Sequence, residues 1–147
     1  MLVVKGSGSS GKSTTLKLAF ESYLQYLVRL NDGVPVEYLY LTKREVAAVI
    51  KLGKLRVGLA TRGDSQNQVK LGLSFFAAHK CRLVVCATRS RGKPLKVAQD
   101  FSLQKLKVQA EEWKKPKDVG SKNQQVANHA FAKEVAGWLQ SASRGNA

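Results

Sequence analysis

Acidic residues are scarce in this 147-residue chain. Ten Asp and Glu stand against 25 Lys and Arg, and the formal net charge is +15. A positive field of this size attracts polyanions, and DNA or RNA is the commonest polyanion that a protein meets. We therefore expect a possible nucleic-acid partner, with a surface that is simply basic as the alternative.

Cysteine and histidine are also rare. The chain has Cys81, Cys86, His79 and His129, and it contains no C-x-x-C pair. A zinc site needs more ligands at closer spacing, so we expect no zinc site of this kind. Both cysteines are interpreted as small core residues or free thiols.

Long apolar runs are missing too. No run approaches the ~20 residues that a membrane-spanning helix needs, so we expect no membrane partner. The N-terminus has no basic region followed by a long apolar stretch, which predicts no secretory signal and a cytoplasmic location. The hydrophobic content of 44% predicts one globular domain over residues 1–147, with a polar, frayed tail over 141–147.

The chain does contain a glycine-rich loop close to its N-terminus. An apolar run, Leu2-Val3-Val4, precedes Gly6-Ser7-Gly8-Ser9-Ser10-Gly11-Lys12-Ser13, which fits G-x-x-x-x-G-K-[ST]. The glycines let successive backbone N–H groups point at phosphate oxygens. Lys12 would reach the β- and γ-phosphates, and the Ser13 hydroxyl would bind Mg²⁺. A Gly/Ser linker is the alternative, but a linker needs no strand, lysine, hydroxyl and helix in this order.

On these residues the chain resembles the P-loop NTPase superfamily. Its short length, early loop and basic rim make it most similar to the small nucleotide-kinase group. The resemblance implies a nucleoside triphosphate and Mg²⁺ as ligands. ATP is the default, because the chain lacks the Asn-Lys-x-Asp stretch of guanine-specific members. The predicted nucleotide-binding residues are Gly6, Ser7, Gly8, Ser9, Ser10, Gly11, Lys12, Ser13 and Thr14.

The rest of the chain alternates strand and helix patterns. This order predicts an α/β fold, with a mainly parallel sheet sandwiched by helices. Strands are expected over 36–41, 82–87 and 106–110. Helices are expected with inward residues Leu16, Phe20, Tyr23, Leu27 and Leu30; Val69, Leu73 and Phe76; and Ala127, Phe131, Val135, Trp138 and Leu139, with a short helix from Pro94 to Phe101.

Two apolar runs, 46–50 and 55–60, flank a tight turn at Gly53. We interpret them as a β-hairpin added to the sheet, with a helix over 43–51 as the alternative. The stretch 31–33, Asn-Asp-Gly, is the predicted stop of the first helix.

Two loops begin with Ala-Thr-Arg directly after a predicted strand, at 60–62 and at 87–89. Because ligands bind beyond the carboxyl ends of parallel strands, both loops are expected beside the phosphate loop. Asp64 in the first loop would order Mg²⁺, bind the substrate or only cap a helix, and Thr61 could offer a hydroxyl near the metal instead. Arg89 and Arg91 in the second loop are candidates to neutralise a transferring phosphate.

The predicted catalytic residues are therefore Lys12, Asp64, Arg89 and Arg91, with Ser13 and Asp64 at the metal. By resemblance, the function is that of a Mg-ATP-binding ATPase or small kinase-like phosphotransferase acting on or with nucleotides or nucleic acid. The alternatives are an NTP-dependent nucleic-acid-binding switch and a nucleotide-binding protein with little catalysis. One departure motivates them: the superfamily usually has an acid at the end of a second strand, whereas here Thr61 holds that place and the acid follows at Asp64.

Overall fold

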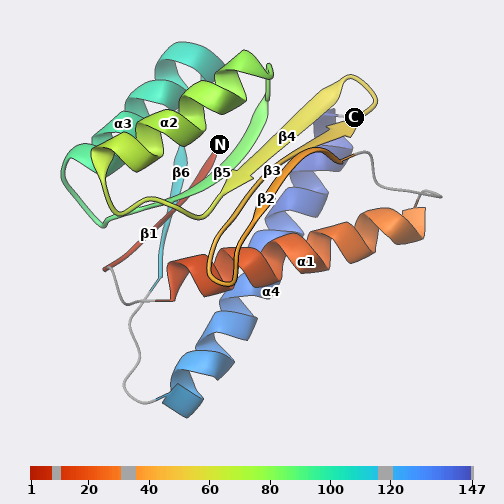
Figure 1. The fold of residues 1–147 in the computed structure, drawn as a ribbon. Coiled ribbons are helices and arrows are strands. Elements are labelled where there is room, and N and C mark those ends of the chain that lie inside the picture. Colours follow the sequence, from red (N-terminus) through yellow and green to blue (C-terminus); the bar gives the residue numbers. More distant parts are fainter. Residues whose placement is uncertain (8–10, 31–35, 116–120, 147) are drawn as a thin grey trace.

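The structure, a computed structural model, describes residues 1–7, 11–30, 36–115 and 121–146. Six strands form one sheet in the order β2-β3-β4-β5-β1-β6, and helices lie on both of its faces (Figure 1). The predicted α/β class is therefore confirmed. The elements are β1 (Leu2–Lys5), α1 (Lys12–Leu30), β2 (Val36–Leu41), β3 (Val46–Leu52), β4 (Leu55–Ala60), α2 (Gln66–Ala78), β5 (Leu83–Thr88), α3 (Lys93–Phe101), a π-helical turn (Ser102–Leu106), β6 (Glu111–Lys114) and α4 (Ser121–Asn146).

The sheet is mixed, with its parallel pairs in one half. β1 lies parallel between β5 and β6, and β4 lies parallel to β5. β3 is antiparallel to both β2 and β4, so the predicted hairpin is confirmed and the alternative helix over 43–51 is wrong. The hairpin turns at Gly53, whose φ of +61° suits glycine. Because β2 also joins the sheet through an antiparallel pair, the sheet has fewer parallel strand pairs than the sequence predicts.

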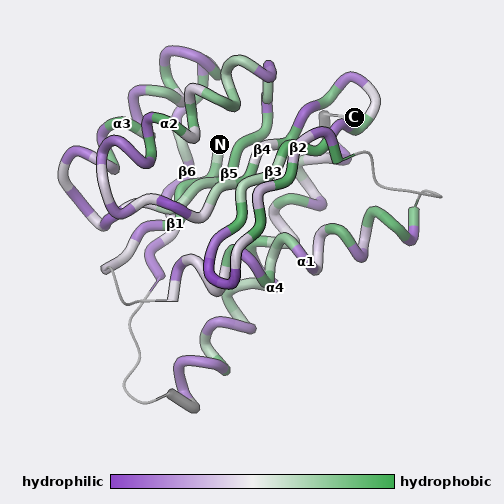
Figure 2. The backbone as a smooth tube through the Cα atoms, in the orientation of Figure 1, coloured by the Kyte–Doolittle hydropathy of each residue, from purple (hydrophilic) through white to green (hydrophobic). Residues whose placement is uncertain are grey.

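Two hydrophobic cores lie on the two faces of the sheet. Leu2 and Val4 of β1 face α1 and α4, whereas Val3 between them faces α2 and α3. This alternation follows from the two-residue period of a strand. β5 is buried at all six positions, as its nearly continuous apolar sequence predicts. Figure 2 shows the hydrophobic residues concentrated in these central strands.

The helices bury most of the residues that the sequence predicts. α1 buries Leu16, Phe20, Tyr23 and Leu27, whereas Leu30 at its end is exposed. The predicted stop at 31–33 lies outside the described residues. The predicted inward face of α2, Val69, Leu73 and Phe76, is confirmed, and α4 buries Val135 and Leu139 while Ala127, Phe131 and Trp138 are half-buried.

The strand predicted over 106–110 is wrong in position. A π-helical turn over Ser102–Leu106 extends into this segment, Lys107 adopts a left-handed φ of +61°, and β6 begins only at Glu111. Both backbone polar groups of Val108 have hydrogen-bond partners in this turn. Its N–H donates to Ser102 O at 3.2 Å, and its carbonyl accepts from Ser102 Oγ at 2.8 Å. This N–H is therefore not available to a strand ladder. β6 occupies the sheet edge beside β1.

The last helix extends further than the sequence predicts. α4 continues to Asn146, through most of the segment expected as a frayed tail over 141–147. Ser143 is buried in this part; its Oγ donates to Leu139 O at 2.6 Å and hydrogen-bonds the hydroxyl of Tyr23 in α1. A polar residue thus joins the two helices, which hydropathy alone does not reveal.

Both cysteines are buried and free, as the sequence predicts. Burial raises the pKa of Cys81 to about 11 and that of Cys86 to about 12, so neither carries a reactive thiolate. Among the described residues, the structure has no helix of the length and hydropathy needed to cross a bilayer.

Candidate functional site

The candidate site lies where the carboxyl ends of β1, β4 and β5 meet. The helix after β1 lies on one face of the sheet and the helix after β5 on the other (Figure 1). Residues of the loops that follow these two strands line a crevice. Ligands of α/β sheets bind at such a switch point. Gly6 N donates to Thr88 O at 3.2 Å, which joins the glycine-rich loop to the loop after β5. Ser13 Oγ lies 3.5 Å from Thr61 O in the loop after β4. The two Ala-Thr-Arg loops therefore lie beside the glycine-rich loop, as predicted.

The glycine-rich loop meets α1 at a position whose backbone conformation favours glycine. Gly11 has a φ of +84°, and a Cβ there would lie 2.5 Å from Asn128 Oδ1 and from Gln124 Nε2. Gly11 O accepts from Thr15 N at 2.9 Å and so starts the helix. Gly8, Ser9 and Ser10 lie outside the described residues. The described part thus has a left-handed glycine followed directly by a helix N-terminus, whose first N–H groups lack intrahelical partners.

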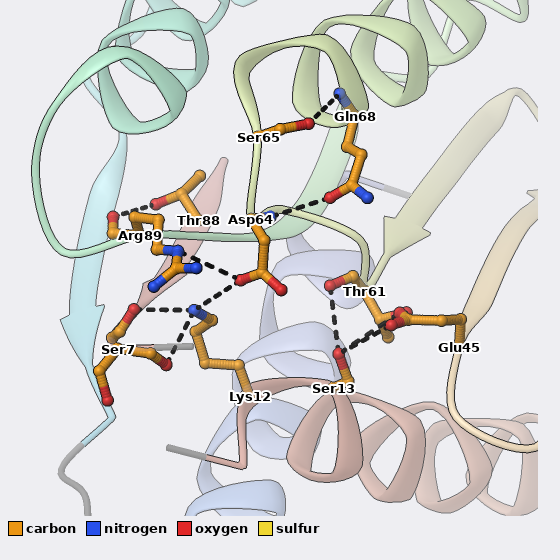
Figure 3. Close-up of polar contacts among 11 residues, drawn as sticks. Ser7, Lys12, Ser13, Glu45, Thr61, Asp64, Ser65, Gln68, Thr88 and Arg89 are labelled. Atoms are coloured by element: carbon orange, nitrogen blue, oxygen red, sulfur yellow. Dashed lines mark hydrogen bonds and ion pairs between the residues drawn. The ribbon is translucent and has the colours of Figure 1, made fainter. Parts of the chain in front are cut away.

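Lys12 is a buried cation within the crevice. Its Nζ donates to Gly6 O at 2.7 Å and to Ser7 O at 3.2 Å, and it lies 3.6 Å from Asp64 Oδ1 (Figure 3). The residue is 6% exposed. Burial lowers the pKa of Lys12, the nearby Arg89 lowers it further, and the Asp64 carboxylate partly offsets both. The ammonium group is therefore short of compensating negative charge.

We expect the lowered pKa of Lys12 to make anion binding sensitive to alkaline pH. Below this pKa the ammonium is present before the ligand arrives, so affinity is flat. Above it, Lys12 must take up a proton to pair with a phosphate, and affinity for a non-hydrolysable ATP analogue falls by about tenfold per pH unit. The fall should begin below the ordinary value of 10.5.

Calorimetric titration from about pH 7 to about pH 10 checks this slope, with Lys12→Arg as the matched variant. Arginine stays charged throughout this range, so its affinity should not fall with pH. Equal slopes in the two proteins would contradict the assignment of the titration to Lys12.

Ser13 lies beside a carboxylate that the sequence analysis missed. Its Oγ lies 3.4 Å and 3.3 Å from the two carboxylate oxygens of Glu45, and 3.5 Å from Thr61 O (Figure 3). Thr61 Oγ1 also donates to Glu45. Glu45 precedes β3, which runs antiparallel to β4, so the start of β3 lies beside the end of β4. The predicted hairpin was the signal that could have placed Glu45 at this edge.

The turn that carries Glu45 is held against α1. Lys17 Nζ donates to Thr42 O at 2.9 Å and to Lys43 O at 3.0 Å. Within the turn, Glu45 N donates to Thr42 Oγ1 at 3.0 Å. These bonds fix the turn to the helix that begins with Lys12, so Glu45 is positioned by α1.

Thr61 is buried directly after β4, where the superfamily usually places an acid. Val46 N donates to Thr61 Oγ1 at 2.9 Å, and Thr61 N donates to Val46 O at 3.0 Å. The side chain thus joins the end of β4 to the start of β3. This hydroxyl orients the Glu45 carboxylate, which supplies the negative charge that Thr61 itself lacks.

Asp64 pairs with two cations and does not cap the following helix. The cap of α2 is Ser65, whose Oγ accepts from Gln68 N at 3.2 Å. Asp64 Oδ1 lies 3.6 Å from Lys12 Nζ and 3.5 Å from Arg89 Nε, and Asp64 N donates to Gln68 Oε1 at 3.1 Å. Of the three interpretations of Asp64, the structure contradicts the one in which Asp64 caps the helix. The carboxylate that contacts Ser13 among the described residues is Glu45.

The loop from Thr61 to Asp64 lies tightly against β5 at Gly63. A Cβ at this position would lie 1.7 Å from Ala87 O, a backbone atom that cannot swing away. Gly63→Ala is therefore expected to lower the free energy of unfolding by at least about 2 kcal/mol. Denaturant unfolding checks this, with Gly137→Ala in α4 as the control, because nothing lies within 4 Å of its Cβ position. The control should change stability by no more than about 1 kcal/mol, upward; equal effects would contradict the close contact.

Both predicted arginines are exposed and line a pocket of about 640 Å³. Arg89 also reaches Asp64. This pocket also has Gly6 and Ser7 in its wall. Thr14 is exposed on the first turn of α1. The complete lining is Gly6, Ser7, Arg89, Ser90, Arg91 and Lys114.

The donor atoms of the site suit magnesium. Mg²⁺ binds oxygen and is typically held by one or two carboxylates together with substrate phosphates and waters. Ser13 and Glu45 provide a hydroxyl and a carboxylate in mutual contact, and Asp64 provides a second carboxylate near Lys12. The described residues contain no group of three or more His, Cys, Asp or Glu that would hold a metal alone. A metal here would therefore need further ligands.

Comparison of the chain with protein-family models, with curated proteins and with solved structures finds no match. The functional argument therefore depends on the geometry of the site.

Proposed function

We propose that this chain is a P-loop NTPase, an ATP-dependent phosphotransferase or ATPase that uses Mg²⁺. The observation that carries the proposal is Lys12, which is buried at the start of α1 and donates to the carbonyls of Gly6 and Ser7. A buried cation at a helix N-terminus, following a glycine-rich loop, favours an anionic ligand of several charges. A triphosphate has these charges and fits the motif.

Lys12 would exchange its present partners for phosphate oxygens. The two loop carbonyls and Asp64 now share its ammonium group. A β- or γ-phosphate oxygen offers more negative charge than a carbonyl, and pairing with it would compensate the burial that lowers the pKa of Lys12. The resting contacts keep the side chain in the crevice before the ligand arrives.

Asp64 and Arg89 form the second half of the proposed site. In the structure, Asp64 pairs with the same two cations that a phosphate would attract, Lys12 and Arg89. A bound phosphate would compete for both cations and free Arg89 to face the transferring group. Its planar guanidinium suits charge that spreads over several oxygens. Asp64 would then be free to orient the acceptor or an attacking water.

Ser13 and Glu45 are the residues that would hold Mg²⁺. Mg²⁺, when bound, would neutralise charge on the β- and γ-phosphates. The chain itself supplies the fixed positions: Thr61 and Ser13 both hydrogen-bond Glu45, so its carboxylate is oriented in advance. Glu45 would thus have the metal-binding role that the sequence suggested for Asp64 or Thr61.

A second candidate function is an NTP-dependent nucleic-acid-binding module. The pocket beside the phosphate loop has three cations in its wall, Arg89, Arg91 and Lys114. Together with the net charge of +15, this favours a polyanion that binds next to the triphosphate. Such binding should weaken steeply with salt.

Product analysis with γ-labelled ATP tests the proposal and separates the two candidates. The protein is incubated with Mg²⁺ and with nucleosides, nucleotides, DNA or RNA in separate reactions. A labelled acceptor supports phosphotransfer, whereas free phosphate that rises with DNA or RNA supports the module. Tight Lys12-dependent binding without turnover would overturn the enzymatic proposal and leave a nucleotide-binding protein. Absence of any triphosphate binding would overturn both.

A further inference from the structure

β2 forms one edge of the sheet, yet it has the composition of an interior strand. All six of its residues are exposed, and five of them are large apolar or aromatic side chains. Tyr40 pairs with Ala47, which packs against the core on the α2 face of the sheet. Leu39 pairs with Ala48, which belongs to the core on the α1 face. β2 is therefore apolar on both faces, as strands in the interior of a sheet are.

Exposed sheet edges are normally protected against pairing with another chain. Proline, lysine or a β-bulge in the edge strand is the usual protection. β2 has neither proline nor lysine, and its one charged residue, Glu37, pairs with Arg56 of β4 at 3.0 Å. A bulge lies between Val36 and Tyr38, but the residues that follow it are in regular register with β3. This second half of β2 is thus open to pairing with another strand.

The hydrogen bonds between β2 and β3 determine which backbone groups of β2 point outward. Thr42 N donates to Glu45 O at 2.9 Å, so these two residues form a hydrogen-bonded pair. Hydrogen-bonded and non-hydrogen-bonded pairs alternate along an antiparallel ladder, which directs the backbone groups of Tyr40 toward β3. The N–H and C=O groups of Leu39 and Leu41 therefore point to the open edge.

We propose that β2 pairs with β2 of a second copy of this chain, antiparallel and about a two-fold axis at Tyr40. Leu39 of each copy would then lie opposite Leu41 of the other, and their outward N–H and C=O groups would hydrogen-bond to one another. An axis perpendicular to the sheet keeps each face on its own side. The two copies of Tyr40 would therefore meet on the α2 face, and the leucines on the α1 face. An axis at Leu39 would instead require Glu37, which lies in the bulge.

The charges at the ends of this interface favour a second copy over an unrelated strand. With the axis at Tyr40, Glu37 of each copy would lie beside the exposed Lys43 of the other. Opposite charges across antiparallel strands stabilise the pairing. A strand of another sequence would have to reproduce both the apolar match and this charge pair. Lys43 precedes Glu45 by two residues, so the second copy would lie beside the candidate site.

Sedimentation velocity over a concentration series tests the proposal, at about 0.3 M salt so that the repulsion between two basic chains is screened. The unmodified chain should form a dimer. Tyr40→Lys should weaken the dimer by about a hundredfold or more, because both copies lose an interface tyrosine and two like charges then face each other. Its circular dichroism spectrum should not change, since Tyr40 is 43% exposed. Val126→Lys is the control: it adds the same charge at an exposed apolar residue of α4 and should dimerise as the unmodified chain does.

Disulfide formation tests the position of the axis. Tyr40→Cys should form a disulfide-linked dimer under mild oxidation, because the two Cα atoms would lie about 4.5 Å apart in a non-hydrogen-bonded pair. Tyr38→Cys is the matched control on the same face of β2. Its two copies would be offset along the strands by about 14 Å, which is beyond the reach of a disulfide. The chain's own cysteines, Cys81 and Cys86, are buried and should not interfere.

Three outcomes would overturn the proposal. The first is a chain that stays monomeric throughout the concentration series. The second is a dimer that Tyr40→Lys leaves unchanged, which would place the interface on another surface. The third is a disulfide in Tyr38→Cys but not in Tyr40→Cys, which would mean that the strands pair in another register. None of these measurements uses a nucleotide, so a failure of the proposed function would leave the interface standing.

Discussion

Lys12→Met is expected to weaken binding of an ATP analogue by about a hundredfold or more while leaving the fold intact. The loss follows because the variant cannot form charge-assisted hydrogen bonds to phosphate, each of which contributes about 1.5–3 kcal/mol. Stability should change little. The variant loses the bonds from Nζ to Gly6 O and Ser7 O, but it also removes a buried charge whose pKa burial has lowered. The substitution should therefore lower the affinity for the ATP analogue while changing the free energy of unfolding little.

Calorimetry and denaturant unfolding measure the two quantities on the same preparation. Lys133→Met is the control, because Lys133 is an exposed lysine of α4. It should bind the analogue as the unmodified protein does, apart from a small effect of net charge at low salt. If Lys12→Met kept full affinity with an unchanged free energy of unfolding, the phosphate-loop assignment would be refuted.

Glu45→Gln is expected to lower turnover by about a hundredfold to a thousandfold and to raise the Mg²⁺ concentration needed for half-maximal activity. Glutamine keeps the shape of the side chain and can still accept from Ser13 and Thr61, so the loop should stay in place. Only the negative charge is lost. Without metal, affinity for the triphosphate should stay the same or increase, because the site then repels the anion less.

Steady-state assays over a Mg²⁺ series measure this effect, with the exposed Glu134→Gln of α4 as a control that should change nothing. Asp64→Asn is the informative comparison. It removes the carboxylate that pairs with Lys12 and Arg89, so turnover should fall without the same change in Mg²⁺ requirement. The reverse result, a shifted Mg²⁺ requirement in Asp64→Asn alone, would assign the metal to Asp64.

The parts of the fold that follow from local periodicity could be predicted from the sequence. The inward faces of α1 and α2, the buried strand β5 and the hairpin of β3 and β4 all have clear patterns of apolar residues. Two elements could not be located in this way. The strand predicted at 106–110 failed because Ser102 closes a turn on Val108, and the end of α4 failed because a single buried serine pairs with Tyr23. Both depend on one side chain and not on a pattern.

The candidate site, too, could be predicted from the sequence only in part. The rim loops could be predicted because strands of one direction end at one edge, and Arg89 and Asp64 do come together there. Glu45 was not predicted because it precedes a strand, whereas an acid was expected at the end of a strand. In an antiparallel hairpin the start of one strand is the neighbour of the end of the other. The predicted hairpin therefore indicates that Glu45 lies at this edge. The rule that ligands bind at the carboxyl ends of parallel strands does not reveal it, because that rule does not consider residues that precede a strand.

The central place of β1 has a consequence for how the molecule is made. Leu2 pairs with Val85 on one side and with Glu111 on the other, so the first strand finds its partners only late in the sequence. Pairings over such distances close slowly, since a long loop must be ordered before they form. During synthesis, β1 and the loop after it must therefore wait until the ribosome has released β5 and β6. A nascent chain that stops before β5 should lack the candidate site, even though it already contains every residue of the glycine-rich motif.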